Sequence, residues 1–423
     1  MIQSKNNLEG SRKMYSWAPK GSWIFGAFAF YLLLIFSLSE YKIRFLDWSS
    51  GILISGFVSI FILLRRRIAK KEAYTILLPL LWTFFALIIT PFAIDISLHL
   101  EKLSLSITFN IIAAFTIITV FSRQHLYPQA ITITTSSWII LNLCFFLLWS
   151  NGSYEYKAGN FSGILRNRNE FAIQTISLLS MMLFFARGNF LKGFLIAVGG
   201  IMILATLSLK GFLFFFFVLF YPLYLSSGLR RRVIAIATGT IVVIAAYLLL
   251  PSIQQRINSV AVAFYNPTEL DASQSALLRM WLAVEGLKVA SENPITGVGV
   301  DNSRLVLIPP GLEARGEEEG FYSHNNYIEM LLNAGVAGLI LYYVPILYMF
   351  FSVKRRHPYY KAIKTLSAFL LLAGFGMVQY NNFSMTILYA TVIFLKLYYT
   401  DLQSNITAKR PGYHTIPDSV EIG

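Results

Sequence analysis

Four basic side chains lie beside apolar segments, where a charged group is costly: Arg166, Arg168, Lys210 and Arg279. The first two belong to "GILRNRNEF", the third to "LSLKGFL" and the fourth to "LLRMWLAVEG". An ionisable group near membrane depth is by default a functional candidate. Arginine offers a planar donor fork to phosphate oxygens, and lysine offers a compact charge. Together the four predict a site for a diphosphate.

An imidazole and several polar side chains accompany these cations. "FYSHNNYIEM" contains His324 and Asn325, and Asn169 and Glu170 follow Arg168. Histidine can take a proton from a hydroxyl near neutral pH. Beside a diphosphate site, it would let an alcohol displace a lipid diphosphate, which is already a good leaving group. We therefore predict His324 as the base, with Asn169, Glu170 and Asn325 in support, and this chemistry requires no metal or other cofactor.

Each of these residues also has a purely structural interpretation. The basic side chains could anchor helix ends at lipid headgroups. Arg279 could form an ion pair with Glu285 or Glu292. His324 could cap the helix that follows it. The position of each side chain decides between the two interpretations.

The composition predicts the elements that hold these residues. The 423-residue chain is 56% hydrophobic and 13% charged, and its mean hydropathy is +0.60. Such a chain is too apolar for a soluble surface. Its apolar runs of roughly 17 to 22 residues suit membrane-spanning helices, so we predict an all-α polytopic protein with about twelve spans. The predicted spans are 22–38, 48–64, 74–94, 103–121, 129–149, 171–186, 190–208, 211–225, 233–250, 336–351, 366–378 and 385–398.

The net charge of +14 follows this topology. Basic clusters at 65–71, 229–233 and 353–357 fall on one side if every span crosses once. The positive-inside rule makes that side the cytoplasm, with both termini there. Because the clusters lie between apolar runs rather than along one face, they do not indicate nucleic-acid binding. The single Cys144 excludes a disulfide framework.

The loop 251–324 is then the largest on the outer face. Its five basic and nine acidic residues give a net charge of 5 − 9 = −4, so the positive-inside rule does not account for its basic residues. We predict a small folded cap with a helix at about 275–291. The predicted organisation is nine spans in 1–250, the cap in 251–324, three spans in 325–400 and a cytoplasmic tail in 401–423.

This topology assigns each histidine to one side of the membrane, and only His324 belongs to the large outer loop. The expected positions are the cytoplasmic side for His125, His357 and His414, and a short outer connector for His99. After His324, the segment "NAGVAG" contains Gly335 and Gly338, which we interpret as a device for close packing.

At these residues the chain resembles the O-antigen ligase and O-antigen polymerase family. The resemblance lies in His324, an amide residue, nine further residues, Gly335, two residues and Gly338. "RMWLAVEGLKVASENPITGVGVDN" and "RNRNEFA" are also similar to family segments. One departure is Lys210, since family members commonly have arginine in this turn; Arg166 and Arg168 could compensate.

The resemblance implies a GT-C-like membrane glycosyltransferase that needs no metal and inverts the anomeric centre. Its donor would be a glycan on undecaprenyl diphosphate, with His324 as base and Arg279 binding the diphosphate. The expected site is the periplasmic face of the inner membrane.

Several functions remain open at this point. A ligase would transfer the glycan to a sugar of the lipid A-core in lipopolysaccharide biosynthesis, whereas a polymerase would extend it on the lipid carrier. We favour the ligase because the whole histidine signature is present. A transporter is disfavoured because the halves show no internal repeat, and a docking scaffold would leave the outer arginines unexplained.

Overall fold

The structure is a computed structural model. It describes residues 70–121, 127–152, 161–165, 167–226, 228–249, 275–309, 320–380 and 382–408, and the single residues 251, 254 and 258. The spans predicted at 22–38 and 48–64, and the side chain of Arg166, lie outside these ranges.

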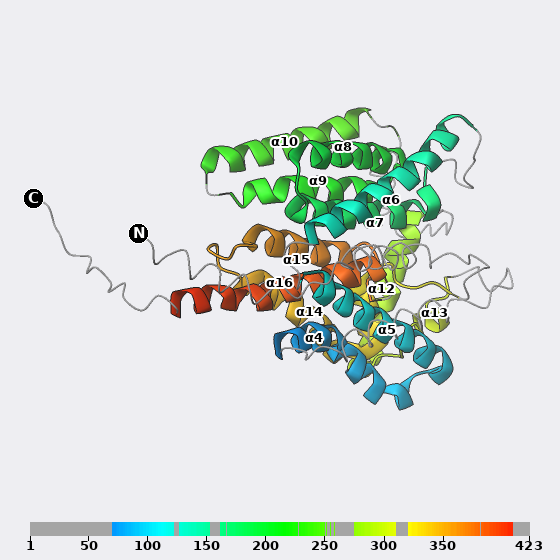
Figure 1. The fold of residues 1–423 in the computed structure, drawn as a ribbon. Helices are drawn as coiled ribbons and strands as arrows, with labels where there is room; N and C mark the ends of the chain where they lie inside the picture. Colours follow the sequence, from blue (N-terminus) through cyan, green and yellow to red (C-terminus); the bar gives the residue numbers. More distant parts are fainter. Residues whose placement is uncertain are drawn as a thin grey trace, which may run out of the picture.

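Helices make up the described structure, and no strand occurs within the residues given above (Figure 1). The all-α prediction is therefore confirmed for this part of the chain. The α-helices are α4 (Lys70–Ile88), α5 (Ile96–Phe121), α6 (Tyr127–Ser150), α7 (Arg168–Phe185), α8 (Asn189–Ala205), α9 (Leu209–Tyr224), α10 (Leu229–Leu249), α12 (Ser275–Glu292), α13 (Ser303–Val306), α14 (Asn326–Ser352), α15 (Tyr360–Gly374) and α16 (Phe383–Ala408). Two short 3₁₀ helices are η1 (Thr90–Phe92) and η2 (Gly163–Leu165).

The long helices are those of a membrane protein. Within the described ranges, three segments are long and apolar enough to cross a bilayer: Ile96–Ile118, Pro128–Ser150 and Asn326–Ser352. Four shorter apolar helices accompany them: Glu72–Ile88, Asn189–Ala205, Leu209–Tyr224 and Phe383–Leu397. The total of about twelve spans stays a prediction.

Two boundaries differ from the predicted ones near the start of α5. The predicted span 74–94 ends earlier, as α4 at Ile88, and η1 follows it. The helix predicted to begin at 103 already begins at Ile96. Hydropathy excluded this first part because it contains polar residues, and His99 was therefore expected in a connector. It lies in α5 instead and is fully buried.

Helix α14 contains a break that hydropathy did not predict. Ala334 (φ −151°, ψ 24°) and Gly335 (φ 61°, ψ −165°) leave the helical conformation. The predicted span 336–351 corresponds to the part after this break, and residues 326–333 form a separate helical section before it. The signature segment therefore carries its histidine at one helical start and its glycines at a second.

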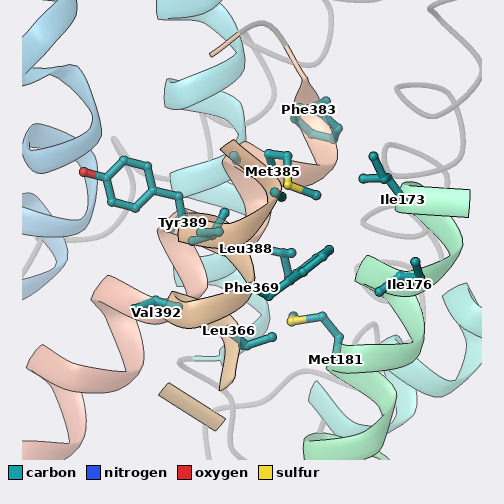
Figure 2. Close-up of a cluster of buried hydrophobic side chains, with 14 of the residues drawn as sticks. Ile173, Ile176, Met181, Leu366, Phe369, Phe383, Met385, Leu388, Tyr389 and Val392 are labelled. Atoms are coloured by element: carbon teal, nitrogen blue, oxygen red, sulfur yellow. The ribbon is translucent and has the colours of Figure 1, made fainter. Parts of the chain in front are cut away.

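A single large apolar core joins the long helices. Figure 2 shows side chains of α7 facing those of α15 and α16; the labelled ones include Ile173, Ile176, Met181, Leu366, Phe369, Met385 and Leu388. A second, smaller cluster packs α12 against the first section of α14 through Leu282, Leu307, Ile328 and Leu332. The helix predicted at 275–291 is thus observed as α12, which lies with α13 towards the right-hand end in Figure 1.

Candidate active site

A cavity of about 440 Å³ lies where several helices begin. Five of the predicted residues line it: Asn169, Glu170, Lys210, Arg279 and His324. They come from α7, α9, α12 and the segment before α14, which are far apart in the sequence. Residues that the sequence pattern did not single out also line it, namely Lys102, Leu105, Asn167, Ile173, Asp301, Arg304, Tyr322, Glu329, Gly376, Met377, Val378, Tyr380 and Asn382.

Two other predicted residues are not part of the lining. Arg168 is the first residue of α7, and it is absent from the cavity wall. Asn325 is the N-cap of α14, where its side chain accepts hydrogen bonds from the backbone N–H groups of Tyr327 and Ile328 at 2.9 and 3.4 Å. Asn325 thus holds the start of α14, and the supporting role predicted for it would act through this helix.

Three capped helix N-termini meet at the cavity. Besides Asn325 on α14, Asn167 caps α7 by accepting from Asn169 N and Glu170 N, and Ser208 caps α9 by accepting from Gly211 N at 3.2 Å. The positive ends of these helix dipoles favour a bound anion. The backbone thus adds to the positive potential that the cationic side chains supply.

Lys210 is held by the segment between α15 and α16. Its ammonium donates to the carbonyl oxygen of Gly376. Next to it, the hydroxyl of Ser208 donates to Asn169 Oδ1 at 2.7 Å, which joins the starts of α7 and α9. The lysine therefore faces the cavity rather than extending to lipid headgroups.

His324 projects into the cavity from a strained backbone. Its φ of 54° is rare for a residue with a side chain, and such positions often occur at functional sites. Its ring centroid lies 4.2 Å from that of Tyr322. Because Asn325 caps α14, the interpretation of His324 as the cap is wrong. In the part of the chain that the structure describes, no hydrogen bond engages its imidazole.

Electrostatics keep this imidazole neutral. Burial lowers the pKa of His324 to about 4, and the charges of Arg279 and Lys210 contribute to the decrease. Near pH 7 the ring therefore has a lone pair available for a proton. Of the two ion-pair partners considered for Arg279, Glu285 pairs with Lys288 at 3.2 Å.

Glu329 fixes the turn that carries His324. This fully buried carboxylate accepts from the Ser303 hydroxyl at 2.7 Å, from the Ser323 hydroxyl at 2.8 Å and from Ser323 N at 2.9 Å. It therefore ties α13 and the residue before His324 to the first section of α14. The sequence pattern contained this glutamate, but hydropathy alone gave no reason to expect a buried carboxylate.

Replacing Glu329 with glutamine is expected to slow catalysis about tenfold and to lower the unfolding temperature. The glutamine amide retains one acceptor oxygen, so either the Ser303 hydroxyl or the N–H and hydroxyl of Ser323 lose their acceptor. Hydrogen bonds to buried charged groups are worth about 1.5–3 kcal/mol. Thermal unfolding and the turnover number at saturating donor measure the two effects. Glu285→Gln is the matched control, because the Glu285–Lys288 pair is on the surface and contributes little. Equal effects of both substitutions would contradict the positioning role.

A glycine-rich turn at 294–300 packs against the break in α14 and leads to Asp301 in the cavity lining. Val298 N donates to Leu332 O at 2.6 Å, and Val336 N donates to Pro294 O at 2.8 Å. In an unbroken helix, Val336 N would instead donate to Leu332 O. A Cβ atom on Gly335 would collide with the carbonyl of Ile295. Close packing at this glycine is confirmed, and its partner is a loop rather than a helix.

His99 holds the same turn from α5. Its Nδ1 accepts from Val300 N at 2.8 Å, so its Nε2 carries the proton and donates to Ala86 O at 3.2 Å. Asp301 and Arg304, which line the cavity, follow directly after this turn. His99 thus has a structural role.

The comparison with protein families bears on the class of membrane protein to which such a cavity belongs. Residues 193–343 match the family described as O-Antigen ligase. The matched segment includes Lys210, Arg279 and His324, so the resemblance noted in the sequence is confirmed. An O-antigen ligase domain indicates a glycosyltransferase-like membrane enzyme that acts on lipid-linked glycans, with ligase or polymerase-like activity. No curated protein matches the chain.

Proposed function

We propose that the protein is an O-antigen ligase that transfers a glycan from undecaprenyl diphosphate to a sugar hydroxyl of the lipid A-core. The observation that carries the proposal is that His324 and two basic side chains, Lys210 and Arg279, line one cavity. The match of the same segment to the O-antigen ligase family supports it. The proposed location is the inner membrane, with the cavity on the periplasmic face and both termini in the cytoplasm.

The proposed reaction is a single displacement. The neutral Nδ1 or Nε2 of His324 takes the proton of the acceptor hydroxyl, and the acceptor oxygen bonds to the anomeric carbon. The bond from that carbon to the diphosphate oxygen breaks on the opposite face, so the configuration inverts. The electron pair leaves with undecaprenyl diphosphate, whose charge Lys210, Arg279 and the helix N-termini stabilise. The proposal includes no metal or other cofactor.

The donor also prepares the base. A histidine with a pKa of about 4 is a weak proton acceptor. Bound diphosphate would counter the positive charges of Arg279 and Lys210, and the pKa of His324 would rise. The proposal thus links donor binding to activation of the acceptor, because the base becomes effective only beside the leaving group.

The pH dependence of transfer tests this link. Transfer requires neutral His324, so the acidic limb of kcat/KM for the donor should lie at about pH 4, the pKa of His324 in the free protein. In Arg279→Gln the pKa rises because a nearby positive charge is lost, and the acidic limb should move to higher pH. In the wild type, the limb of kcat should lie above that of kcat/KM. An acidic limb that is identical in wild type and Arg279→Gln would contradict the assignment.

Reconstitution tests the reaction itself. Purified full-length protein, undecaprenyl-diphosphate-linked glycan and lipid A-core are combined, and the lipid products are separated by gel electrophoresis. The ligase forms glycan joined to the lipid A-core and releases undecaprenyl diphosphate. Longer glycans that remain on the lipid carrier would overturn the proposal in favour of a polymerase. No transfer with either acceptor would overturn the enzymatic function.

A further inference from the structure

We propose that an uncharged acceptor sugar binds on one wall of the cavity, formed by Asp301, Arg304 and Tyr322, with Asp301 accepting hydrogen bonds from its hydroxyl groups. This inference rests on the proposed function, because it assigns the second substrate of the same site. It names residues that neither the signature segment nor the family comparison assigns to a ligand.

Asp301 has an acceptor oxygen available for a ligand. The residue is 3% exposed and lines the cavity. Its Oδ1 accepts from Arg304 Nε at 3.2 Å, and within the described ranges no hydrogen bond reaches Oδ2. Oδ2 borders the cavity, so it can accept a hydrogen bond from a ligand there. A ligand that leaves water for the cavity needs partners for its hydroxyl groups, and Oδ2 would supply one.

The wall continues from Asp301 to the proposed base. The Arg304 guanidinium lies 5.6 Å from the centroid of the Tyr322 ring, which in turn lies 4.2 Å from the His324 ring centroid. From the Asp301 carboxylate to the His324 imidazole, each group therefore neighbours the next. A sugar bound against these groups would place one hydroxyl at His324 and others at Asp301.

Charge separates this wall from the diphosphate site. Arg304 is paired with Asp301, and Lys102, which also acts on Asp301, is paired with Glu101 at 3.1 Å, so neither pair carries a net charge. By contrast, Arg279 and Lys210 both act on His324 as positive charges. An anion is favoured on their side, whereas an uncharged sugar suits the ion pair and the phenol ring.

The wall is held in place before any ligand binds. Asp301 N donates to Asn333 Oδ1 at 3.2 Å, and Gly320 N donates to Arg304 O at 2.9 Å. Phe321 N donates to Leu307 O at 3.0 Å, which fixes the chain just before Tyr322. Such preorganisation reduces the cost of ordering side chains when the acceptor arrives.

Steady-state kinetics with both substrates varied tests the assignment. Initial rates are measured with the purified full-length protein, once with lipid A-core varied at saturating donor and once with the donor varied at saturating lipid A-core. Asp301→Asn should raise the acceptor KM about tenfold, the effect expected for a hydrogen bond to a charged group, and change the donor KM less than about twofold. Glu292→Gln, an exposed carboxylate at the end of α12, should change neither.

A second variant tests the same wall if Asp301→Asn does not fold. Tyr322→Phe retains the ring and removes only the hydroxyl, and it should raise the acceptor KM about threefold. An increase of the donor KM alone in either variant would show that the wall binds the donor glycan, and would overturn the inference. Unchanged constants in both would do the same. Loss of the proposed function itself would appear separately, as absence of transfer in the wild type.

Discussion

Replacing His324 with asparagine is expected to lower the transfer rate by about 10²- to 10⁴-fold while the protein keeps its fold. Asparagine tolerates the positive φ of 54° found at this position better than most residues, so the turn should be retained. It has no group that can take a proton near neutral pH. The loss is therefore expected in kcat, with the donor KM changed little because Lys210 and Arg279 remain.

The measurement is the rate of glycan transfer at saturating substrates, with thermal unfolding as the test of folding. His357→Asn is the matched control, because His357 lies between α14 and α15, outside the cavity lining, and its Nδ1 accepts from Tyr359 N at 3.1 Å. It should transfer glycan at close to the wild-type rate. If His324→Asn kept both the wild-type rate and its pH dependence, His324 would not be the base.

Replacing Gly335 with alanine should have the largest effect on the structure of the site. Its φ of 61° disfavours any Cβ atom, and an added Cβ would collide with the carbonyl oxygens of Ile295 and Pro294. Backbone cannot move aside as a side chain can. We expect a loss on the order of 3 kcal/mol in the free energy of unfolding and at least about tenfold slower transfer.

Thermal unfolding and the transfer assay again measure these effects. Gly239→Ala in α10 is the control, because its added Cβ would meet only Phe220, at 3.7 Å. Alanine in a helix interior is neutral or favourable. A Gly335→Ala protein as stable and active as Gly239→Ala would show that the break in α14 is not required.

The sequence was sufficient to predict the residues that share a motif or a topological side. His324, Arg279 and Lys210 were expected on one face, and the structure places all three on one cavity. The sequence could not predict that Lys102 and Arg304 line the same cavity, because their positions depend on contacts between segments that are distant in the chain. No local pattern encodes such contacts.

Hydropathy also failed where polar groups are buried with partners. His99 was assigned to a connector because a histidine interrupts an apolar run, but its two ring nitrogens are bonded to Val300 and Ala86. Glu329 is similar, since three donors satisfy its carboxylate. Scales that assign a cost to each residue separately cannot anticipate such compensation.

The break in α14 has a mechanical consequence. The helical hydrogen bond from Val336 N to Leu332 O is absent at the break. The loop at 294–298 forms a hydrogen bond with each of these two groups instead. If this loop moved away, the Leu332 carbonyl and the Val336 N–H would lose their hydrogen-bond partners in apolar surroundings, at a cost of several kcal/mol. These hydrogen bonds fix the loop to both sections of α14, and they thereby hold Asp301, which follows the loop, in the cavity lining.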